Sequence, residues 1–301
     1  MQNFLDFHVA IACQPWAISA DVLASLGATV GGGPQGPTRA ASRATTRPGR
    51  VQAGTAVVPV IGPIQQHRGF FEMVGLGSSC ATISKALRAA LADDDIQRIV
   101  LDFDSPGGAC FGIDELATEI RSARNIKPIT AVANSLCASA AYWLASSCSE
   151  IYCTPGGMAG SIGVIASHQD LSAAMAAAGI KTTLITAGAH KAENNSFEAL
   201  GAAGRATMQR LVDSYGNDFT KAVSKGRGVP VETVRATFGQ GRTMRADAAL
   251  AAGMINGIAT LDEVLARRLR PGISRTQAAQ AYSRMPRALS QAMRELDLLS
   301  N

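Results

Sequence analysis

A serine and a lysine each follow a predicted buried strand, and together they could supply a nucleophile and its base. Ser139 lies in a run of small residues after one such strand, and Lys191 follows another. A serine hydroxyl is a weak nucleophile until a neighbouring base takes its proton. A lysine becomes such a base when burial among apolar groups lowers the pKa of its amine. The pair therefore predicts a serine–lysine hydrolase.

The turn at residues 104–108, Asp-Ser-Pro-Gly-Gly, could supply groups that stabilise an oxyanion. Gly107 and Gly108 offer bare backbone N–H groups, and the N–H of Ala140 directly follows the candidate nucleophile. Open α/β sheets place their sites at the carboxyl ends of strands. We therefore expect the strand before this turn to lie beside the strand that precedes Ser139, with Gly107 as the second donor besides Ala140.

A second hydroxyl group comes from Ser161, in the segment 160–164, Gly-Ser-Ile-Gly-Val. A small polar group beside a buried lysine can orient its amine and share its proton. Each candidate also has a commoner interpretation: Ser139 could be a helix N-cap, and Lys191 a solvated surface charge. A histidine-based triad is the weaker alternative, because the sequence contains four histidines but no G-x-S-x-G elbow.

Residues 51–266 alternate strand-like and helix-like runs, and these elements must position the candidate residues. The expected strands are apolar and rich in β-branched residues, at 55–61, 96–103, 129–133, 150–153, 161–166 and 181–186. The expected helices have apolar residues at helical spacing or are rich in alanine, at 82–91, 112–123, 139–145, 171–178 and 205–224. Such alternation predicts an α/β fold with a largely parallel sheet.

Segments of different composition flank this predicted domain. Residues 1–30 form an N-terminal segment with an expected short helix at 18–26. Residues 31–50 carry four arginines and no acidic residue, and this composition predicts a flexible basic linker. Residues 267–301 are expected to form a basic tail, whose few apolar residues are compatible with a helix that docks on a partner.

The overall composition excludes several classes of protein. The 301 residues are 47% hydrophobic and 17% charged, which is typical of a soluble globular enzyme, and no apolar stretch is long enough to span a bilayer. The net charge of +5 is mild and gathers near the two ends, so it predicts no specific nucleic-acid partner. The six cysteines form no CxxC pair and no cluster with histidine, which predicts neither a disulfide framework nor a metal site. No cofactor is expected.

Four ordered motifs resemble those of a known enzyme family, the S49 serine peptidases or signal-peptide-peptidase-A group, within the ClpP/crotonase superfamily. The motifs are the segments 57–64, 104–108, 137–143 and 160–164, and the segment that ends in Lys191 follows them. The spacing of the candidate serines and the lysine also resembles that of the family. The resemblance runs from about residue 55 to residue 265, most of the chain.

The resemblance implies a role for each candidate residue. Ser139 would be the nucleophile, Lys191 the general base, and Ser161 the hydroxyl that supports the lysine. Gly107 and Ala140 would be the oxyanion donors. The resemblance also implies a ClpP/crotonase-like fold of ββα repeats, and a homo-oligomer ringed around shared active sites.

Within the family, the chain is most similar to the phage head-maturation branch. The membrane-bound branch carries an N-terminal transmembrane helix, whereas this sequence shows none, and the segment 15–18, Pro-Trp-Ala-Ile, resembles the phage branch. The branch implies cleavage of scaffold, portal or coat proteins, and of the chain itself, in a procapsid in the cytoplasm of a bacterial host. Three alternatives stay open: a cytosolic host peptidase of the same family, an acyl-CoA enzyme of the crotonase kind, and a non-catalytic capsid component.

Overall fold

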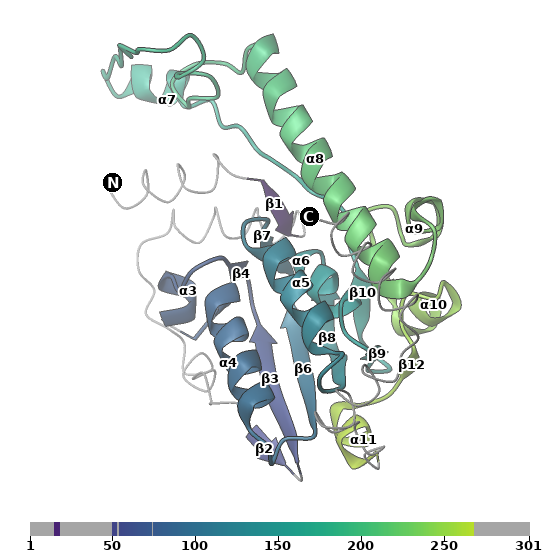
Figure 1. Ribbon diagram of the computed structural model, residues 1–301. Helices are drawn as coiled ribbons and strands as arrows, with labels where there is room; N and C mark the ends of the chain where they lie inside the picture. Colours follow the sequence, from purple (N-terminus) through teal and green to yellow (C-terminus); the bar gives the residue numbers. More distant parts are fainter. Residues whose placement is uncertain (1–14, 19–49, 53, 74, 268–301) are drawn as a thin grey trace, which may run out of the picture.

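The main sheet of the protein is mixed, and its central strands are parallel (Figure 1). The computed structural model describes residues 15–18, 50–52, 54–73 and 75–267. The strands of this sheet are β2 (Arg50–Gln52), β3 (Thr55–Ile61), β6 (Arg98–Ser105), β8 (Ile129–Ala138), β9 (Glu150–Cys153), β10 (Met158–Gly160), β11 (Thr243–Arg245) and β12 (Gly257–Ile258). The sequence therefore predicted the α/β class and the parallel sheet correctly.

Strand β8 is the centre of this sheet, and two different strands share one of its edges. Its other edge pairs in parallel with β6, which in turn pairs in parallel with β3. The first half of the shared edge pairs with β9, and residues 136–138 at its end pair with β10, both in parallel. Because these strands are parallel, the carboxyl ends of β6, β8 and β10 meet at one edge of the sheet.

A second, smaller sheet lies at that edge and contains the glycine turn. Its strands, in spatial order, are β1 (Trp16–Ile18), β7 (Gly107–Ala109), β4 (Ile64–Gln65) and β5 (Ser78–Ser79). The pairing of β1 with β7 is antiparallel, whereas β4 pairs in parallel with both β7 and β5. Strand β7 follows β6 after one residue, so the small sheet continues from the carboxyl end of the large one.

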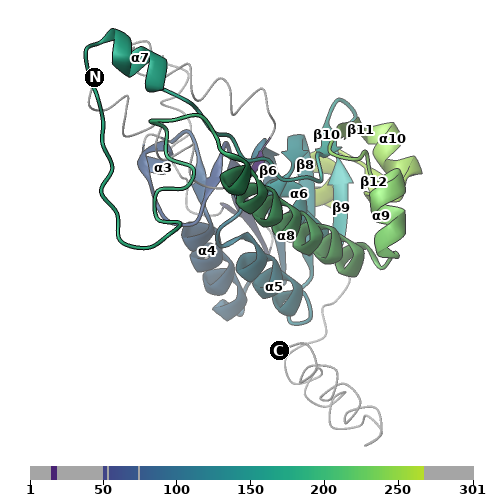
Figure 2. The same ribbon diagram turned by 90° about the horizontal axis from the view of Figure 1, so that it is seen from above.

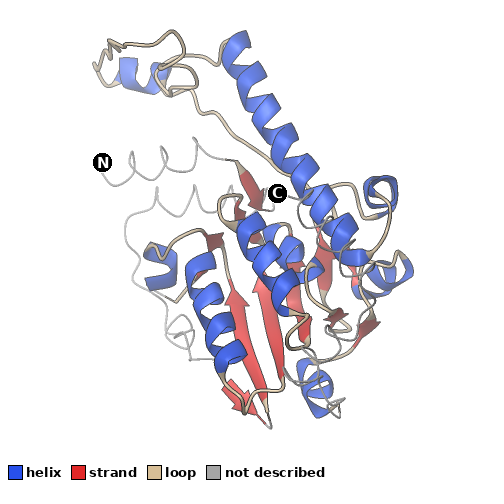
Figure 3. Cartoon of the chain, in the orientation of Figure 1, coloured by secondary structure: helices blue, strands red, loops and turns tan. Residues whose placement is uncertain are grey.

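Most helices cover one face of the main sheet, and one short helix lies on the other (Figures 1, 2 and 3). The helices are α3 (Phe70–Met73), α4 (Cys80–Ala92), α5 (Ile113–Ala123), α6 (Ala140–Ser146), α7 (Ser172–Ala177), α8 (Ala202–Arg227), α9 (Val231–Thr237), α10 (Ala246–Ala251) and α11 (Leu261–Ala266). Successive side chains of a strand point to opposite faces. Accordingly, Ile99 and Leu101 of β6 pack under α4 and α5, whereas Val100 packs with Val264 of α11.

Helix α6, directly after β8, is completely buried between the sheet and other helices. Small residues make up most of its sequence, which lets neighbouring helices approach closely. Its Trp143 ring stacks on Phe219 of α8, with ring centroids 4.6 Å apart and an interplanar angle of 9°. This contact fixes α8 against the helix that begins at the candidate nucleophile.

The segment between β10 and α8 extends away from the sheets as an arm, which we define as residues 166–201. Figure 1 shows α7, in this arm, beyond the end of α8 that lies farthest from the main sheet. The arm exposes large apolar side chains, and Ile185 is 95% exposed. The first half of α8 is also largely exposed, while Phe219 and Val223 in its second half are fully buried.

Two predicted strands are wrong. Residues 161–166 leave the sheet after Gly160 and form only an isolated bridge, between Ile165 and Trp16. Residues 181–186 lie in the arm without regular structure. A strand needs a neighbour for its backbone groups, and within the described part of the chain this apolar segment has none.

Several predictions fall partly or wholly outside the described residues. These are the helix at 18–26, of which Ile18 belongs to strand β1 instead, the linker 31–50, of which Arg50 begins β2, and the tail after Arg267. In the part of the chain that is described, no helix combines the length and the apolar character needed to cross a membrane.

Candidate active site

Ser139 lies at the junction where β8 ends and α6 begins. Its backbone has φ 55° and ψ −121°, a conformation that is strained for a residue with a side chain. The strain lets the chain turn sharply from the strand into the helix, so that the serine stands at the carboxyl edge of the sheet. The N–H of Ala140 belongs to the first turn of α6, where helical N–H groups have no acceptor within the helix.

The loop 160–163 surrounds this serine with backbone carbonyl groups. The Ser139 N–H donates to the Gly160 carbonyl oxygen at 2.7 Å, and the Ser139 hydroxyl donates to the Gly163 carbonyl oxygen at 3.4 Å. The second contact is long for a hydroxyl donor. The hydroxyl, though fully buried, is therefore held only weakly by the rest of the described protein.

Gly107 passes directly beside Ser139. The pairing of β6 with β8, the strands that precede these two residues, is as the sequence predicted. A methyl group added to Gly107 would lie 2.8 Å from Ser139 Cβ and 2.1 Å from the carbonyl oxygen of Ala17, both closer than contacts allow. The φ of Gly107 is 101°, which also favours glycine. The structure thus brings the glycine turn and the serine together, although they are more than thirty residues apart in sequence.

Ser105 orients this turn, a role that was not predicted from the sequence. Its fully buried hydroxyl donates to the Gly62 carbonyl oxygen at 2.7 Å and accepts from the Gly107 N–H at 3.2 Å. A buried hydroxyl that bridges two backbone groups fixes their relative position. Its place between two turn residues was a usable signal, because serine side chains often bond nearby backbone groups. Gly108, the other glycine of the turn, runs so close to Ile64 that an added methyl would lie 1.9 Å from the Ile64 carbonyl oxygen.

Ser161 lies beside Ser139, because it follows the strand that pairs with the end of β8. Its N–H donates to the Arg242 carbonyl oxygen at 2.9 Å, and its φ of 56° is again in the left-handed region. Ser161 is also largely buried. Ser139, Ser161 and Gly107 therefore come from three different strand ends and meet at one place.

Lys191 is the predicted site residue that the chain does not bring to this place. It lies in the arm, in a turn where its N–H donates to the Gly188 carbonyl oxygen at 3.2 Å, and it is exposed. Among the hydrogen bonds and ion pairs of the described residues, none joins Lys191 to Ser139 or Ser161.

Among the described residues, the histidine and cysteine side chains offer no alternative nucleophile system at this site, and His67 is exposed. Within the described residues, His190 pairs with Glu193, and His168 contacts the Asn195 carbonyl oxygen, all in the arm. Burial raises the pKa of the Cys110 thiol to about 12 and that of Cys137 well above its ordinary value. These thiols are therefore protonated at neutral pH, so neither can serve as a thiolate nucleophile.

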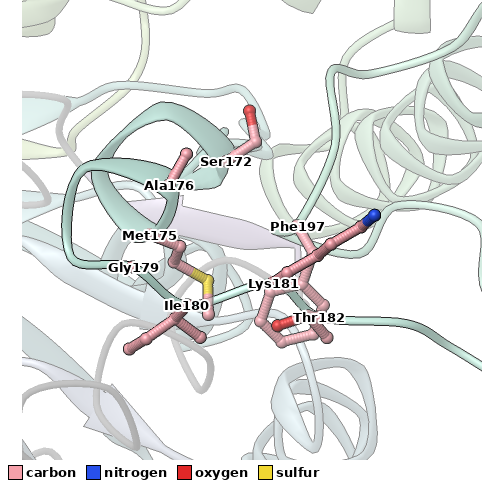
Figure 4. Close-up of a pocket in the computed structure, with 8 residues that line it drawn as sticks. All are labelled: Ser172, Met175, Ala176, Gly179, Ile180, Lys181, Thr182 and Phe197. Atoms are coloured by element: carbon pink, nitrogen blue, oxygen red, sulfur yellow. The ribbon is translucent and has the colours of Figure 1, made fainter.

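A hollow on the described surface lies elsewhere, in the arm (Figure 4). It has a volume of about 410 Å³ and lies between α7 and the chain that follows it, with Met175, Ile180, Lys181 and Phe197 on its walls. None of the candidate site residues lines it. The hollow therefore does not mark the place where Ser139 acts.

Comparisons with known proteins agree with the sequence motifs. Residues 121–270 match the model of Peptidase family S49, a range that includes Ser139, Ser161 and Lys191. The chain is 38% identical over 188 residues to the head-tail preconnector protein GP5 of Enterobacteria phage P21. The aligned region covers 62% of this chain and 38% of that protein.

Two other relatives extend the comparison. The capsid assembly protease C of Escherichia phage lambda is 33% identical over 223 residues, which covers 72% of this chain and 49% of that protein. Protease 4 of Haemophilus influenzae is 24% identical over 185 residues, 61% of this chain and 30% of that protein. The chain thus spans half or less of the length of these relatives. With its parallel sheet and its matching family model, the chain contains a peptidase domain of family S49, which has a ClpP-like fold.

Proposed function

We propose that the chain is a serine endopeptidase in which Ser139 is the nucleophile and Lys191 the general base. The observation that carries this proposal is the strained, buried Ser139 at a strand–helix junction, in contact with the glycine turn at Gly107. A strained residue survives where the surrounding structure holds it, and such residues concentrate at active sites. The match to Peptidase family S49 also supports peptide-bond hydrolysis by this chain.

The reaction follows from the roles of these groups. Lys191 takes the proton of the Ser139 hydroxyl as its oxygen attacks the scissile carbonyl. The N–H of Ala140 stabilises the oxyanion, together with N–H groups of the Gly107–Gly108 turn. The Gly107 N–H, which donates to the Ser105 hydroxyl at 3.2 Å, takes part once it turns from that hydroxyl to the oxyanion. The lysine then gives its proton to the leaving amine, and an acyl-enzyme forms. Lys191 next activates a water molecule, which releases the second product. Ser161 orients the lysine amine.

Lys191 reaches the nucleophile of a neighbouring copy in this proposal. The arm that carries it extends away from the sheets, and it exposes apolar side chains that are unusual for a free surface, Ile185 above all. A homo-oligomer would cover these side chains and bring each arm to the next copy. Burial in that interface would also desolvate the lysine amine, as its role as a base requires.

Capsid proteins are the proposed substrates. The two phage relatives are named as a capsid assembly protease and a head-tail preconnector protein, and both share more than 30% of aligned residues with this chain. We infer that the chain acts in a procapsid in the host cytoplasm, where it cleaves scaffold, portal or coat proteins and also itself.

Fragment mapping by mass spectrometry tests this function. The purified protein is incubated with candidate phage coat and scaffold proteins, and matched samples carry Ser139→Ala or Lys191→Ala. Ser146→Ala removes another buried serine hydroxyl, and Lys181→Ala removes another lysine of the arm, so both serve as controls. Specific fragments should disappear in both test variants and persist in both controls.

Two results would contradict the proposal. Cleavage that survives in Ser139→Ala would assign the activity to another group. Full-length coat and scaffold proteins in mature particles assembled with the wild-type chain would exclude the peptidase function in maturation. Binding of CoA by the purified protein would instead favour the crotonase-type alternative.

A further inference from the structure

Strand β1 is a three-residue strand held by backbone contacts on both sides. On one side it pairs antiparallel with β7, with Trp16 opposite Ala109 and Ile18 opposite Gly107. On the other side, the Trp16 N–H donates to the Ile165 carbonyl oxygen at 2.8 Å, and the Ile165 N–H donates to the Trp16 carbonyl oxygen at 2.9 Å. Figure 1 shows β1 directly beside β7, at the edge of the sheets where the candidate site lies.

The backbone of β1 passes the candidate nucleophile. The carbonyl oxygen of Ala17 and Cβ of Ser139 would both contact the same methyl group if one were added to Gly107. The Ala17 carbonyl therefore lies in the immediate neighbourhood of the Ser139 side chain and of the glycine turn. These are the groups that a scissile carbonyl would have to approach in the proposed reaction.

The strand is also thoroughly buried for so short an element. Trp16 and Ile18 are each 4% exposed, and Ala17 between them is fully buried. Next to them, the Pro15 carbonyl oxygen accepts from the Cys110 N–H at 3.3 Å. The site around Ser139 is thus filled by a segment that comes from more than a hundred residues earlier in the chain.

Extended peptides commonly bind to proteins by adding a strand to the exposed edge of a sheet. A peptide substrate whose carbonyl reaches Ser139 and the glycine turn would pair with the edge of β7 and with Ile165. Both partners are already engaged by β1. We infer that residues 15–18 occupy the place of the substrate strand and exclude substrates until they are displaced; this inference rests on the proposed peptidase function.

The sequence of residues 15–18 also indicates which side chains a substrate would present to the site. Side chains of a strand alternate, so Trp16 and Ile18 point to one side and Ala17 to the other. The site that holds them accommodates a small residue between two large apolar ones. We expect the protein to bind extended segments of that pattern.

A binding experiment tests the inference without relying on catalysis. All proteins carry Ser139→Ala, so that no peptide is cleaved, and the probe is a fluorescently labelled peptide of residues 14–20, Gln-Pro-Trp-Ala-Ile-Ser-Ala. Fluorescence anisotropy compares the intact strand with Trp16→Ala, which removes its largest buried side chain. Tyr152→Ala is the matched control, because it removes a buried aromatic side chain that packs on the opposite face of the main sheet.

When a segment of the protein occupies the site, only the molecules with an open site can bind the peptide. The apparent Kd of the peptide is then its intrinsic Kd divided by the open fraction. We expect Trp16→Ala to bind the peptide about tenfold more tightly or better, and Tyr152→Ala to bind it as weakly as the protein with the intact strand. Hydrogen exchange at the Ile165 amide should accelerate in Trp16→Ala and slow again when the peptide is added. Equal peptide affinity in Trp16→Ala and in the intact strand would overturn the inference.

The same variants with Ser139 restored separate this inference from the proposed function. Faster peptide hydrolysis by Trp16→Ala than by the wild type supports both proposals. Tighter peptide binding without hydrolysis by any protein that retains Ser139 supports the occupied site and counts against the peptidase.

A second route avoids a variant that fails to fold. A recognition sequence for a specific protease is inserted after Gly36, and the folded full-length protein is cut there. An excess of the labelled peptide should then displace the N-terminal fragment and bind in its place. A cut protein that still excludes the peptide at every concentration would show that β1 is a permanent part of the sheet.

Discussion

Ser139 and Ser161 each directly follow the last residue of one of two paired strands, β8 and β10, and both have φ near 55°. Ala138 pairs with Gly160 in parallel register, so the two serines leave the sheet side by side. A residue with a side chain pays about 1–3 kcal/mol to be held in such a sparsely populated backbone conformation. Two strained residues thus lower the stability of the protein at the same edge of the sheet, and such residues cluster at functional sites.

The strain at Ser139 predicts that two substitutions of this residue have the same effect on activity but different effects on stability. Ser139→Gly and Ser139→Ala should both lower kcat by about 10³-fold or more, because each removes the nucleophile. Ser139→Gly should nevertheless be more stable than Ser139→Ala by about 1 kcal/mol, since glycine adopts φ 55° without strain. Urea denaturation of the two variants measures the difference in the free energy of unfolding. If Ser139→Ala were more stable than Ser139→Gly, the backbone at this position would not be strained.

The close passage of Gly107 predicts a severe effect of one methyl group. Gly107→Ala should abolish peptidase activity and displace β1, because the methyl would overlap the Ala17 carbonyl oxygen and press on Ser139. Gly156→Ala is the control, since an added methyl there meets nothing within 4 Å. Peptide hydrolysis and thermal unfolding check both variants. Normal activity in Gly107→Ala would show that the turn does not approach the reacting atoms.

The bridging hydroxyl of Ser105 predicts a positioning role. Ser105→Ala should lower kcat more than it changes KM, and it should cost about 1–3 kcal/mol of stability, because two buried backbone groups lose their partner. Ser146→Ala, a control at an equally buried serine, loses only a bond to the Trp143 carbonyl within its own helix. Its kcat should match that of the wild type. Partial recovery of kcat in Ser105→Thr, which retains a hydroxyl, would distinguish positioning from packing.

The distance of the arm from its own nucleophile predicts complementation between inactive variants. Ser139→Ala and Lys191→Ala should each be inactive alone. Mixed and reassembled, they should regain roughly a quarter of the wild-type activity, because random pairing places an intact serine beside an intact lysine from a neighbour in that share of sites. An inactive mixture, with mixed oligomers verified by mass spectrometry, would place both residues of the dyad in one copy.

Buried thiols predict a loss of stability in alkaline solution. Burial raises the pKa of Cys80 and Cys110 from an ordinary 9.0 to about 12, so the folded protein retains protons that the unfolded chain releases. The stabilisation is complete below pH 9 and is lost as the pH rises toward 12, by up to about 1.4 kcal/mol per pH unit for each thiol. Urea denaturation between pH 8 and 10.5 measures the slope. Cys110→Ala should reduce it, and an unchanged slope would exclude this thiol as a cause.

Much of the main sheet could be predicted from local patterns. The strand 150–153 was predicted with its observed bounds, and the strand 129–133 lies within β8. These runs are buried on both faces of a parallel sheet, where apolar and β-branched residues are continuous. The turn from β8 to Ser139 and the approach of Gly107 were expected for a related reason, because parallel strands end at one edge.

Long-range pairing explains what could not be predicted. Residues 181–186 have the composition of a strand, but composition does not tell whether a neighbour is present, and in the described chain there is none. Conversely, Trp16–Ile18 forms a strand only because Gly107–Ala109 and Ile165 lie on either side of it. The position of Lys191 is also non-local, since its place in the sequence says nothing about the direction in which the arm leaves the sheet.

The stacking of Trp143 on Phe219 has a consequence for the dimensions of any assembly. Trp143 lies four residues after Ser139, and its ring fixes Phe219 of α8. From Phe219, α8 runs back to Ala202, where the arm joins it. At 1.5 Å per residue, that stretch of helix measures about 26 Å. In the proposed homo-oligomer, copies that exchange lysines through their arms would therefore be spaced on a scale determined by the length of one helix. Shortening α8 by whole turns would then change the spacing of the copies.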